Sequence, residues 1–152
     1  MAVNVRLNRY NLGAGDFVTP GMQLHYVAEA KPDEPAVIRI HSDGSEERIS
    51  WSELDKLTNQ MAWMLMDKGV RPDSTVLVSY PNSIEHICAN YAIWKTGACY
   101  MPVSCRTSAE ELLELQTLLS PAAALTDIDV DEKVFKCGMD ELRGACSGYP
   151  ED

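Results

Sequence analysis

The sequence predicts an α/β fold, a partial doubly wound and mostly parallel sheet with helices on its faces. Between residues 75 and 126, short apolar runs alternate with amphipathic segments, and Gly or Pro stands at most of the junctions. Strands separated by helices pair in parallel, because a parallel neighbour is reached only through a crossover of about a dozen residues or more. The runs are continuously apolar, which is typical of strands covered on both faces.

Length and composition fit one folded domain, so we expect residues 1–152 to form a single unit. Hydrophobic residues make up 45% of the chain and charged residues 24%, which favours a packed core over disorder. The formal net charge of −10 repels phosphate backbones, so no nucleic acid partner is expected. No apolar run approaches the ~18 residues that a membrane span needs. The domain divides into an irregular arm (1–20), a helix plus hairpin (21–50), a helix followed by a βαβαβ core (51–127) and a tail (128–152).

The N-terminus and the cysteines predict a cytoplasmic protein. Residues 1–17 contain no continuous apolar stretch of the kind that a secretion signal has. The five cysteines are odd in number and form no C-x-x-C pair, which is typical of buried or partly buried free thiols in a reducing compartment.

A weak helix and a hairpin are expected before the core. The apolar positions between Pro20 and Ala30 fit a short helix that Pro32 ends. Ala36–His41 is rich in branched residues and predicts a strand. The Asp-Gly pair within residues 42–45 predicts a tight turn, after which 48–50 returns as a second strand.

Two helices carry clear start signals. Ser50 and Glu53 have the spacing of a capping box, in which each side chain satisfies an N–H group of the first turn. The same spacing recurs at Ser108 and Glu111. The first of these helices has an apolar stripe that we expect to be core, and Gly69 is placed to end it. The stripe consists of Leu54, Leu57, Met61, Met64 and Leu65.

The remaining elements follow in a regular order. Strands are expected at 75–80, 99–103 and 122–126, and helices at 83–96 and 108–119. The side chains of the first of these helices that are expected to point inward or half inward are Ile84, Ile87, Cys88, Tyr91, Ala92 and Trp94. The tail is expected to hold a strand at 133–137, a short helix at 139–143 and a linker at 147–152 that does not dock on the domain.

Tests for catalytic and metal motifs give no complete site. Gly13 and Gly15 begin a dinucleotide fingerprint, but Val18 takes the place of its third glycine. The alternating carboxylates of 127–131 lack the glycine and the final carboxylate of a calcium loop, which favours a solvated acidic loop. His25, His41 and His86 lie far apart without metal-ligand spacing. No catalytic residue and no metal ligand is therefore predicted.

Several stretches, in order and at the same spacing, resemble the N-terminal region of the acyl-adenylate-forming (acyl-CoA synthetase, AMP-binding) superfamily. The resemblance covers about residues 35–127. It is carried by Ile49–Leu54, Gly69–Val78, Pro81–Ser83, Ile93–Pro102 and Ala109–Leu112.

A narrower set of stretches is similar to the bile acid–CoA ligases of intestinal anaerobic bacteria. It consists of Tyr10–Gly13, Phe17–Gly21, Pro81–His86 and Ala92–Pro102. The resemblance implies an ATP-dependent carboxylic acid–CoA ligase that forms an acyl-adenylate and then a thioester, using ATP, CoA and Mg²⁺. The phosphate-binding loop and the other ATP-binding motifs of the superfamily are absent from these 152 residues, so the chain looks like a truncated N-terminal subdomain that is inactive alone.

The resemblance singles out one ligand-contacting candidate. Arg106 follows the last motif at the place where several CoA ligases have an Arg that contacts the CoA nucleotide phosphate. The alternative, an ion pair with Glu110 or Glu111, stays open. Lys95 belongs to a superfamily motif, but near a helix C-terminus it favours a structural role. His86 favours a helix-surface or interface position over that of a catalytic base.

Two functions follow for the chain as a whole. The first is the N-terminal subdomain of a ligase, with the remainder of the ligase chain and a small-molecule carboxylate substrate, a bile acid, as partners. No ligand is expected to bind this subdomain alone, and its uncovered apolar surface predicts self-association. The second is a standalone α/β binding or interaction module without catalysis.

Overall fold

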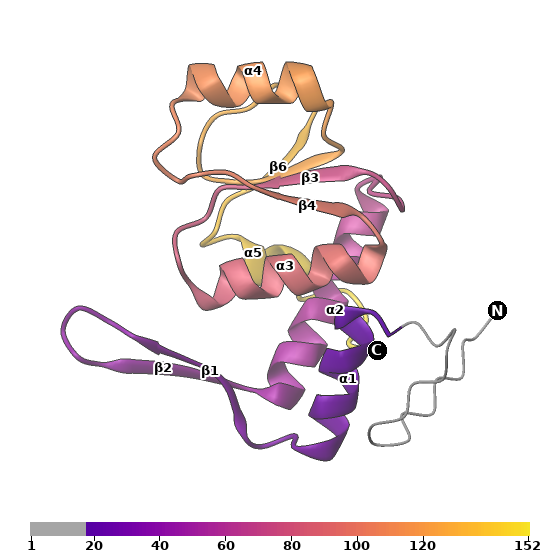
Figure 1. Cartoon of the computed structure of the whole chain (residues 1–152), viewed down its shortest axis with the longest axis vertical. Coiled ribbons are helices and arrows are strands. Elements are labelled where there is room, and N and C mark those ends of the chain that lie inside the picture. The colour runs from indigo at the N-terminus through magenta and orange to yellow at the C-terminus, as the bar shows by residue number, and fades with distance from the viewer. Residues whose placement is uncertain (1–17) are drawn as a thin grey trace.

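The structure is a computed structural model that describes residues 18–152. The predicted helix, hairpin and alternating core are all present, and Figure 1 shows their arrangement. In chain order, the elements are α1 (Pro20–Ala30), β1 (Pro35–Ile40), β2 (Glu46–Ser50), α2 (Trp51–Asp67), β3 (Thr75–Val78), α3 (Ile84–Thr96), β4 (Cys99–Pro102), α4 (Ala109–Leu119), β5 (Ala123–Leu125), β6 (Phe135–Cys137) and α5 (Leu142–Cys146).

The four-stranded sheet lies between two helical layers, which confirms the predicted fold class. Its strand order is β4-β3-β5-β6, and every neighbouring pair is parallel. Helix α4 covers one face, while α3, α5 and part of α2 lie on the other (Figure 1). The alternation of side chains divides the core in the same way. Leu77 and Ala124 pack with Leu112 of α4, whereas Val76 and Val78 join the larger cluster on the opposite face.

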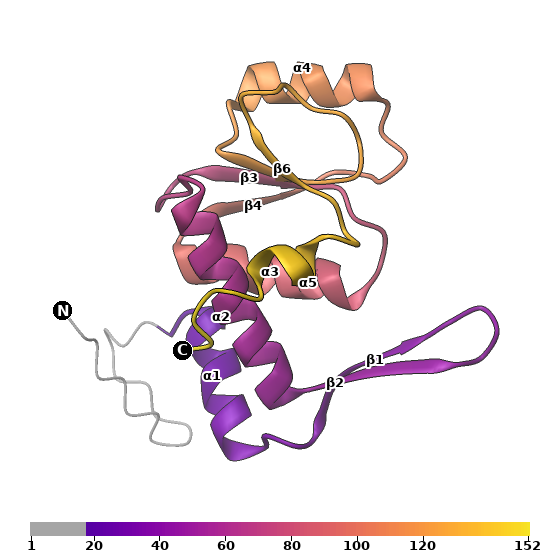
Figure 2. The ribbon, with the colours of Figure 1, turned by 180° about the vertical axis from the view of Figure 1, so that it is seen from behind.

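The hairpin of β1 and β2 projects from the body of the domain (Figures 1 and 2). The amide of His41 donates to the carbonyl of Ser45 at 2.8 Å, and Gly44 adopts a positive φ of 83°. This is the conformation that the predicted Asp-Gly turn needs, since only glycine adopts it without steric cost. The returning strand begins at Glu46, two residues earlier than expected.

Helix α2 forms the centre of the larger core cluster. Both hydrogen bonds of the Ser50–Glu53 capping box are present, as they are for Ser108 and Glu111 at the start of α4. Four residues of the predicted stripe are fully buried and Leu57 is partly buried. Gly69 follows the helix with a φ of 95°, so the predicted end is confirmed. Because the stripe packs against α3 and the sheet, its methionines are core residues.

The structure corrects two expectations about individual side chains. Trp94 was expected inward or half inward, but 38% of it is exposed, and its ring stacks edge-on against Tyr91 and Tyr100. The cysteines are all free thiols, as expected. However, Cys99 and Cys105 are exposed rather than buried. Cys99 is the first residue of the edge strand β4, and Cys105 lies on the loop that follows this strand.

The tail is more ordered than the sequence predicts. Strand β6 is shorter than the expected 133–137 and pairs with β5 as a fourth parallel strand. The short helix α5 begins three residues later than expected. Among residues 18–152, no helix combines the length and the apolar character that crossing a bilayer requires.

The prediction that residues 147–152 form an undocked linker is wrong. Their backbone lies along α2, where side chains spaced at about one helical turn donate to their carbonyls. Asn59 donates to Glu151 at 2.8 Å, and the Trp63 indole donates to Asp152 at 2.9 Å. The Tyr149 hydroxyl donates to Asp67 at 2.8 Å, and its ring packs against the core cluster. These contacts join residues more than 80 positions apart, which local sequence patterns do not reveal.

Candidate functional site

The C-terminal ends of the four parallel strands lie at one edge of the sheet. The chain passes from β3 to β4 on one side and from β5 to β6 on the other. The connections therefore leave β3 and β5 in opposite directions, and ligands in open α/β sheets commonly bind where this happens. Ser79 and Tyr80 follow β3 at this position, and Thr126 and Asp127 follow β5.

Polar groups at this edge are held by other parts of the chain. The hydroxyl of Ser79 donates to the carbonyl of Ser104 at 3.2 Å. The hydroxyl of Tyr80 donates to the carbonyl of Cys137 at 2.8 Å, and burial raises the pKa of Tyr80, so the phenol stays neutral and keeps donating. Asp127 accepts from the amide of Met139 at 3.0 Å. The hydroxyl groups of Ser79 and Tyr80 therefore donate to backbone carbonyls of neighbouring segments and hold this edge of the sheet together.

Arg106 lies on the loop that follows β4, at the same edge of the sheet. Its amide donates to the hydroxyl of Ser104 at 3.1 Å. The carbonyl of Ser104 accepts from the hydroxyl of Ser79, which places this loop beside the end of β3. Among the ion pairs of residues 18–152, none joins its guanidinium to Glu110 or Glu111. The carboxylate of Glu111 instead accepts from the amide of Ser108 at 3.1 Å. The side chain is exposed, which leaves a cation available to an anionic ligand.

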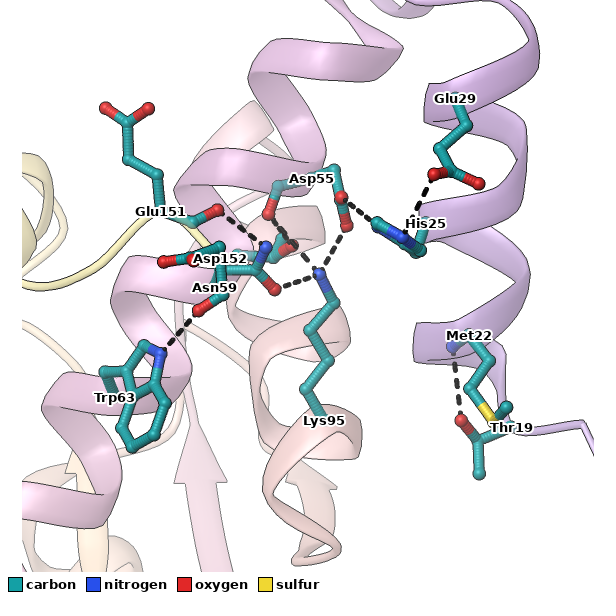
Figure 3. Close-up of polar contacts among 11 residues, drawn as sticks. Thr19, Met22, His25, Glu29, Asp55, Asn59, Trp63, Lys95, Glu151 and Asp152 are labelled. Carbon is teal, nitrogen blue, oxygen red and sulfur yellow. Dashed lines mark hydrogen bonds and ion pairs between the residues drawn. The ribbon is translucent and has the colours of Figure 1, made fainter. Parts of the chain in front are cut away.

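A second polar cluster, which the sequence did not predict, links three helices (Figure 3). Lys95 of α3 donates from Nζ to Oδ1 of Asp55 and to Oδ1 of Asn59, both at 2.6 Å. Asp55 and Asn59 stand one turn apart on α2. On the far side of Asp55, Nδ1 of His25 from α1 lies 2.9 Å from Oδ2. One carboxylate therefore connects α1, α2 and α3.

Burial gives this cluster its electrostatic character. Side-chain exposure is only 12% for Lys95 and 10% for Asp55. Loss of hydration lowers the pKa of Lys95 from its ordinary value, while the hydrogen bond and charge of Asp55 oppose that change. Because the ammonium group already has two short acceptors, this arrangement suits a structural ion pair better than a nucleophile or proton donor. The structural role expected for Lys95 agrees with this geometry.

Gly21 shows how closely α1 approaches this lysine. A Cβ atom at Gly21 would lie 2.7 Å from Cγ of Lys95, which is closer than van der Waals contact allows. The helix begins at Pro20, and the hydroxyl of Thr19 accepts from the amide of Met22 at 3.2 Å. The cap therefore positions the glycine against α3.

An open cavity of about 460 Å³ borders the cluster. Its lining is mainly apolar, with polar groups at its margin. It is lined by Thr19, Gly21, Met22, His25, Tyr26, Asn59, Ala62, Trp63, Met66, Lys95 and Asp152. The cavity lies beside the first and last parts of the described chain and does not include Arg106.

His86 lies in the first turn of α3 and is half-buried. Its Nδ1 atom lies 2.9 Å from the carbonyl of Tyr80, so this nitrogen carries the proton and donates. Its Nε2 atom lies 2.6 Å from the hydroxyl of Tyr100, which then donates to it. Both ring nitrogens are engaged, so His86 connects α3 with β4, consistent with an interface residue.

The cofactors implied by the resemblance fit this chain to different degrees. ATP with Mg²⁺ needs a phosphate cradle and oxygen ligands, yet no set of three or more His, Cys, Asp or Glu side chains in residues 18–152 is arranged to hold a metal ion. The described residues therefore do not form that site. A CoA phosphate fits one group, the exposed guanidinium of Arg106.

The backbone conformation at Gly97 explains why the superfamily motif Ile93–Pro102 has a glycine at this position. Gly97 ends α3 with a φ of 79°, and its amide donates to carbonyls of the last turn. A Cβ atom at this position would lie 3.4 Å from Cβ of Pro72. A left-handed conformation against a neighbouring proline therefore favours glycine at this point.

Comparisons with known proteins agree with these features. Bacitracin synthase 2 from Bacillus licheniformis is 37% identical over 76 residues, which cover 50% of this chain and 3% of that protein. Tyrocidine synthase 1 from Brevibacillus parabrevis is 32% identical over 122 residues, covering 78% of this chain and 11% of that protein. The chain therefore spans only a small part of these relatives.

A solved structure shows the same fold. The fatty acyl CoA synthetase of Mycobacterium tuberculosis superposes with a TM-score of 0.75 at 21% identity, over 88% of this chain and 29% of that one. The family model described as AMP-binding enzyme matches residues 24–146, which include α2, the whole sheet and the motif at Gly97. The chain belongs to the AMP-binding enzyme family.

Proposed function

We propose that this chain is the N-terminal subdomain of an ATP-dependent carboxylic acid–CoA ligase and that the carboxylate is a bile acid. The family match over residues 24–146 carries the first part. The fold shared with a fatty acyl CoA synthetase supports CoA as the thiol. The bile acid is supported by the resemblance of four stretches, of which Tyr10–Gly13 and the first residue of Phe17–Gly21 lie outside the described residues.

In this proposal, the subdomain contributes a frame and one ligand contact. The loop after β4 is held by the hydrogen bond from Ser79 to Ser104, and Arg106 lies on this loop with its side chain exposed. A guanidinium suits a phosphate group because it can donate two parallel hydrogen bonds. Adenylate formation depends on the remainder of the ligase chain, which supplies the ATP and Mg²⁺ site. We also place the protein in the cytoplasm, in keeping with five free thiols.

The peptide synthases among the relatives support a second candidate, an adenylating domain that passes its acyl group to a carrier-bound thiol instead of CoA. The two candidates differ in the thiol acceptor and in the acid. The complete enzyme carrying this region should be assayed with ATP, CoA and a panel of bile acids, fatty acids and amino acids. Bile acyl-CoA formation supports the ligase. Amino acid adenylation without transfer to CoA contradicts it.

Arg106 gives a sharper test within the same enzyme. Arg106→Ala should raise the KM for CoA about tenfold or more, since one charge-assisted hydrogen bond contributes about 1.5–3 kcal/mol. Acid-dependent pyrophosphate exchange, which precedes CoA binding, should stay unchanged. Arg106→Lys keeps the charge and should recover part of the affinity. An equal loss in both half-reactions would place Arg106 outside the CoA site.

The 152-residue chain alone should bind neither nucleotide. A single charge-assisted contact falls short of the ~4 kcal/mol that even millimolar affinity requires. Calorimetric titration with MgATP and with CoA should therefore give no binding heat. Micromolar binding of either would favour the alternative of a standalone binding module.

A further inference from the structure

The side chain of Asn59 joins the Lys95 cluster to the tail of the described chain (Figure 3). Its oxygen, Oδ1, accepts from Nζ of Lys95 at 2.6 Å. Its nitrogen, Nδ2, donates to the backbone carbonyl of Glu151 at 2.8 Å. One carboxamide therefore connects two parts of the chain that lie 36 and 92 positions after it in the sequence.

The two neighbours of Asn59 allow only one orientation of its carboxamide. An ammonium group can only donate a hydrogen bond, and a backbone carbonyl can only accept one. Turning the carboxamide over would place Nδ2 against Nζ of Lys95 and Oδ1 against the carbonyl of Glu151, so both hydrogen bonds would be lost. Lys95 therefore directs the donor of Asn59 toward the tail.

The ammonium group of Lys95 is itself held in place. In addition to its bond with Asn59, Nζ donates to Oδ1 of Asp55 at 2.6 Å and to the backbone carbonyl of Asp55 at 3.3 Å. These acceptors use all three N–H groups of the ammonium. The side chains of Lys95 and Asp55 are almost fully shielded from water, so water competes little for these bonds. The buried ion pair therefore sets the position of Nζ, and the carboxamide of Asn59 is aligned by it.

The bond from Asn59 lies between other contacts that hold the tail on α2. The Trp63 indole donates to the next carbonyl, that of Asp152, at 2.9 Å. Gln60 donates to the carbonyl of Tyr149 at 3.1 Å. Within residues 18–152, Asn59 alone is hydrogen-bonded both to this tail and to the buried ion pair.

We propose that Asn59 is a positioning residue through which the pair of Lys95 and Asp55 determines where the tail lies on α2. In the proposed ligase, the remainder of the chain follows this tail and supplies the ATP site. The docked tail then sets where that part of the enzyme begins relative to the sheet. This last step rests on the proposed function, whereas the coupling from Lys95 to the tail does not.

Exchange of the Trp63 indole proton with solvent, followed by NMR in the 152-residue chain, tests the coupling. This proton is donated to Asp152, so its exchange is slowed only while the tail is docked. Trp63→Phe identifies its resonance among those of the three tryptophans. Asn59→Asp keeps an acceptor for Lys95 but turns a second acceptor toward the carbonyl of Glu151. Exchange should therefore become about tenfold faster or more.

Lys56→Ala is the matched control, because Lys56 contacts the same tail residue without touching the buried pair. Its Nζ atom lies 3.3 Å from the carboxylate of Glu151, and more than half of each side chain is exposed. Such a pair contributes little, so exchange of the Trp63 indole proton should stay unchanged. Unchanged exchange in Asn59→Asp, or equal acceleration in Lys56→Ala, overturns the proposal.

Removing the ion pair tests whether Lys95 acts through Asn59. Asp55→Leu combined with Lys95→Met leaves no charge of the pair buried without its counterion and removes no hydrogen bond to the tail. Exchange at Trp63 should nevertheless become faster. In an Asn59→Ala background, the same double substitution should cause no further acceleration, because the link is already absent. Additive effects of the ion pair and of Asn59 would show that they act independently, which overturns the coupling.

The complete enzyme tests the consequence for the reaction. When the tail is docked only part of the time, the arrangement that binds ATP is less populated, and the apparent affinity for ATP falls by that fraction. Asn59→Asp should therefore raise the KM for ATP in acid-dependent pyrophosphate exchange about tenfold, with kcat at saturating ATP unchanged. Lys56→Ala should change neither value.

The two ways in which this experiment can fail are distinguishable. A lower kcat with an unchanged KM for ATP in Asn59→Asp would show that Asn59 only stabilises the fold, which overturns its positioning role. A wild-type enzyme that adenylates no acid contradicts the proposed function, and with it the step to the ATP site. The exchange rates of the Trp63 indole proton decide the coupling from Lys95 to the tail in either case.

Discussion

Lys95 and Asp55 form a buried ion pair, 2.6 Å from Nζ to Oδ1, that joins the last turn of α3 to the first third of α2. The sequence separation is 40 residues, and His25 of α1 reaches the same carboxylate. The pair lies on one side of the core, between three helices, and borders the cavity at which residue 152 lies. Through His25, the pair therefore contributes to holding α1 against α2 and α3.

Removing the carboxylate of Asp55 should destabilise the domain strongly. Asp55→Ala leaves the ammonium of Lys95 buried without its counterion, and we expect the free energy of unfolding to fall by about 3–5 kcal/mol. Lys95→Met combined with Asp55→Leu removes both charges and should cost much less. Urea denaturation followed by circular dichroism measures both.

A matched control separates burial from pairing. Lys31 and Glu34 also form a 2.9 Å ion pair, but both side chains are more than half exposed. Glu34→Ala should change stability by about 1 kcal/mol or less. Equal losses for Asp55→Ala and Glu34→Ala would show that burial does not strengthen the Lys95 pair.

Gly21→Ala should destabilise the domain, because the new methyl group meets the stem of Lys95 at 2.7 Å. The stem cannot swing aside freely, since its Nζ atom is held by Asp55 and Asn59. Overpacking of this kind costs about 1–3 kcal/mol. Gly144→Ala, where no atom lies within 4 Å of the new Cβ, should be neutral or slightly stabilising. Thermal unfolding of the two variants, side by side, checks the difference in sign.

Stability should fall at alkaline pH. Burial raises the pKa of Cys88 to about 12 and that of Cys137 to about 11, from an ordinary value of 9.0, and it also raises the pKa of Tyr80. The unfolded chain then loses these protons at lower pH than the folded chain. The stability that each group contributes is fully present below its unfolded pKa and declines by about 1.4 kcal/mol per pH unit above it. The decline runs from pH 9 to about 12 for Cys88, from pH 9 to about 11 for Cys137, and begins at pH 10 for Tyr80.

Substituting one of these buried thiols measures how much it contributes to the decline of stability with increasing pH. Burial lowers the pKa of Lys95, so deprotonation of this residue increases stability as pH rises toward the unfolded pKa of lysine. This single contribution is smaller than the combined loss from the two thiols and Tyr80. Cys88→Ala should flatten the decline above pH 9, whereas Cys99→Ser, at an exposed thiol, should leave the slope intact. Urea midpoints between pH 7 and 11 measure this. An unchanged slope in Cys88→Ala would contradict the assignment.

Deleting residues 149–152 should weaken the domain, because these residues are docked on α2. Loss of the bonds from Asn59 and Trp63 and of the Tyr149 contact should lower the free energy of unfolding by about 1–3 kcal/mol. The fluorescence of Trp63 should also change, since its indole loses its acceptor. Tyr149→Phe keeps the chain and should cost only about 0.5–1 kcal/mol. A deletion with no effect on either measurement would show that the tail does not dock in solution.

Local patterns predicted most of the elements, because caps and turns depend on neighbours in sequence. Ser50 with Glu53, and Gly44 in its turn, act within four residues, and each lies where its pattern indicates. Boundaries shifted where tertiary pairing decided them, as at β6, which is set by its partner β5. The fold class followed from the same alternation of strands and helices.

The site was harder to predict, because its contacts are distant in sequence. Arg106 came only from a family resemblance, while the link from Lys95 to Asp55 was missed. One signal was present: Asp55 follows Leu54 and precedes Thr58 on the inward side of α2, where a charged residue needs a partner. No pattern identified which residue that partner would be. The docked tail left no comparable signal, since its acceptors are backbone carbonyls.

Thr19 and Asp152 line the same cavity, so the described chain starts and finishes on one side of the domain. In an isolated version of residues 19–152, a short glycine–serine bridge between these two residues and a new opening at the exposed turn of residues 42–45 would give a circular permutant that keeps the core contacts of this region. The order of the helices and strands along the chain would then change while their packing is conserved, which makes this domain a suitable scaffold for changes in chain connectivity.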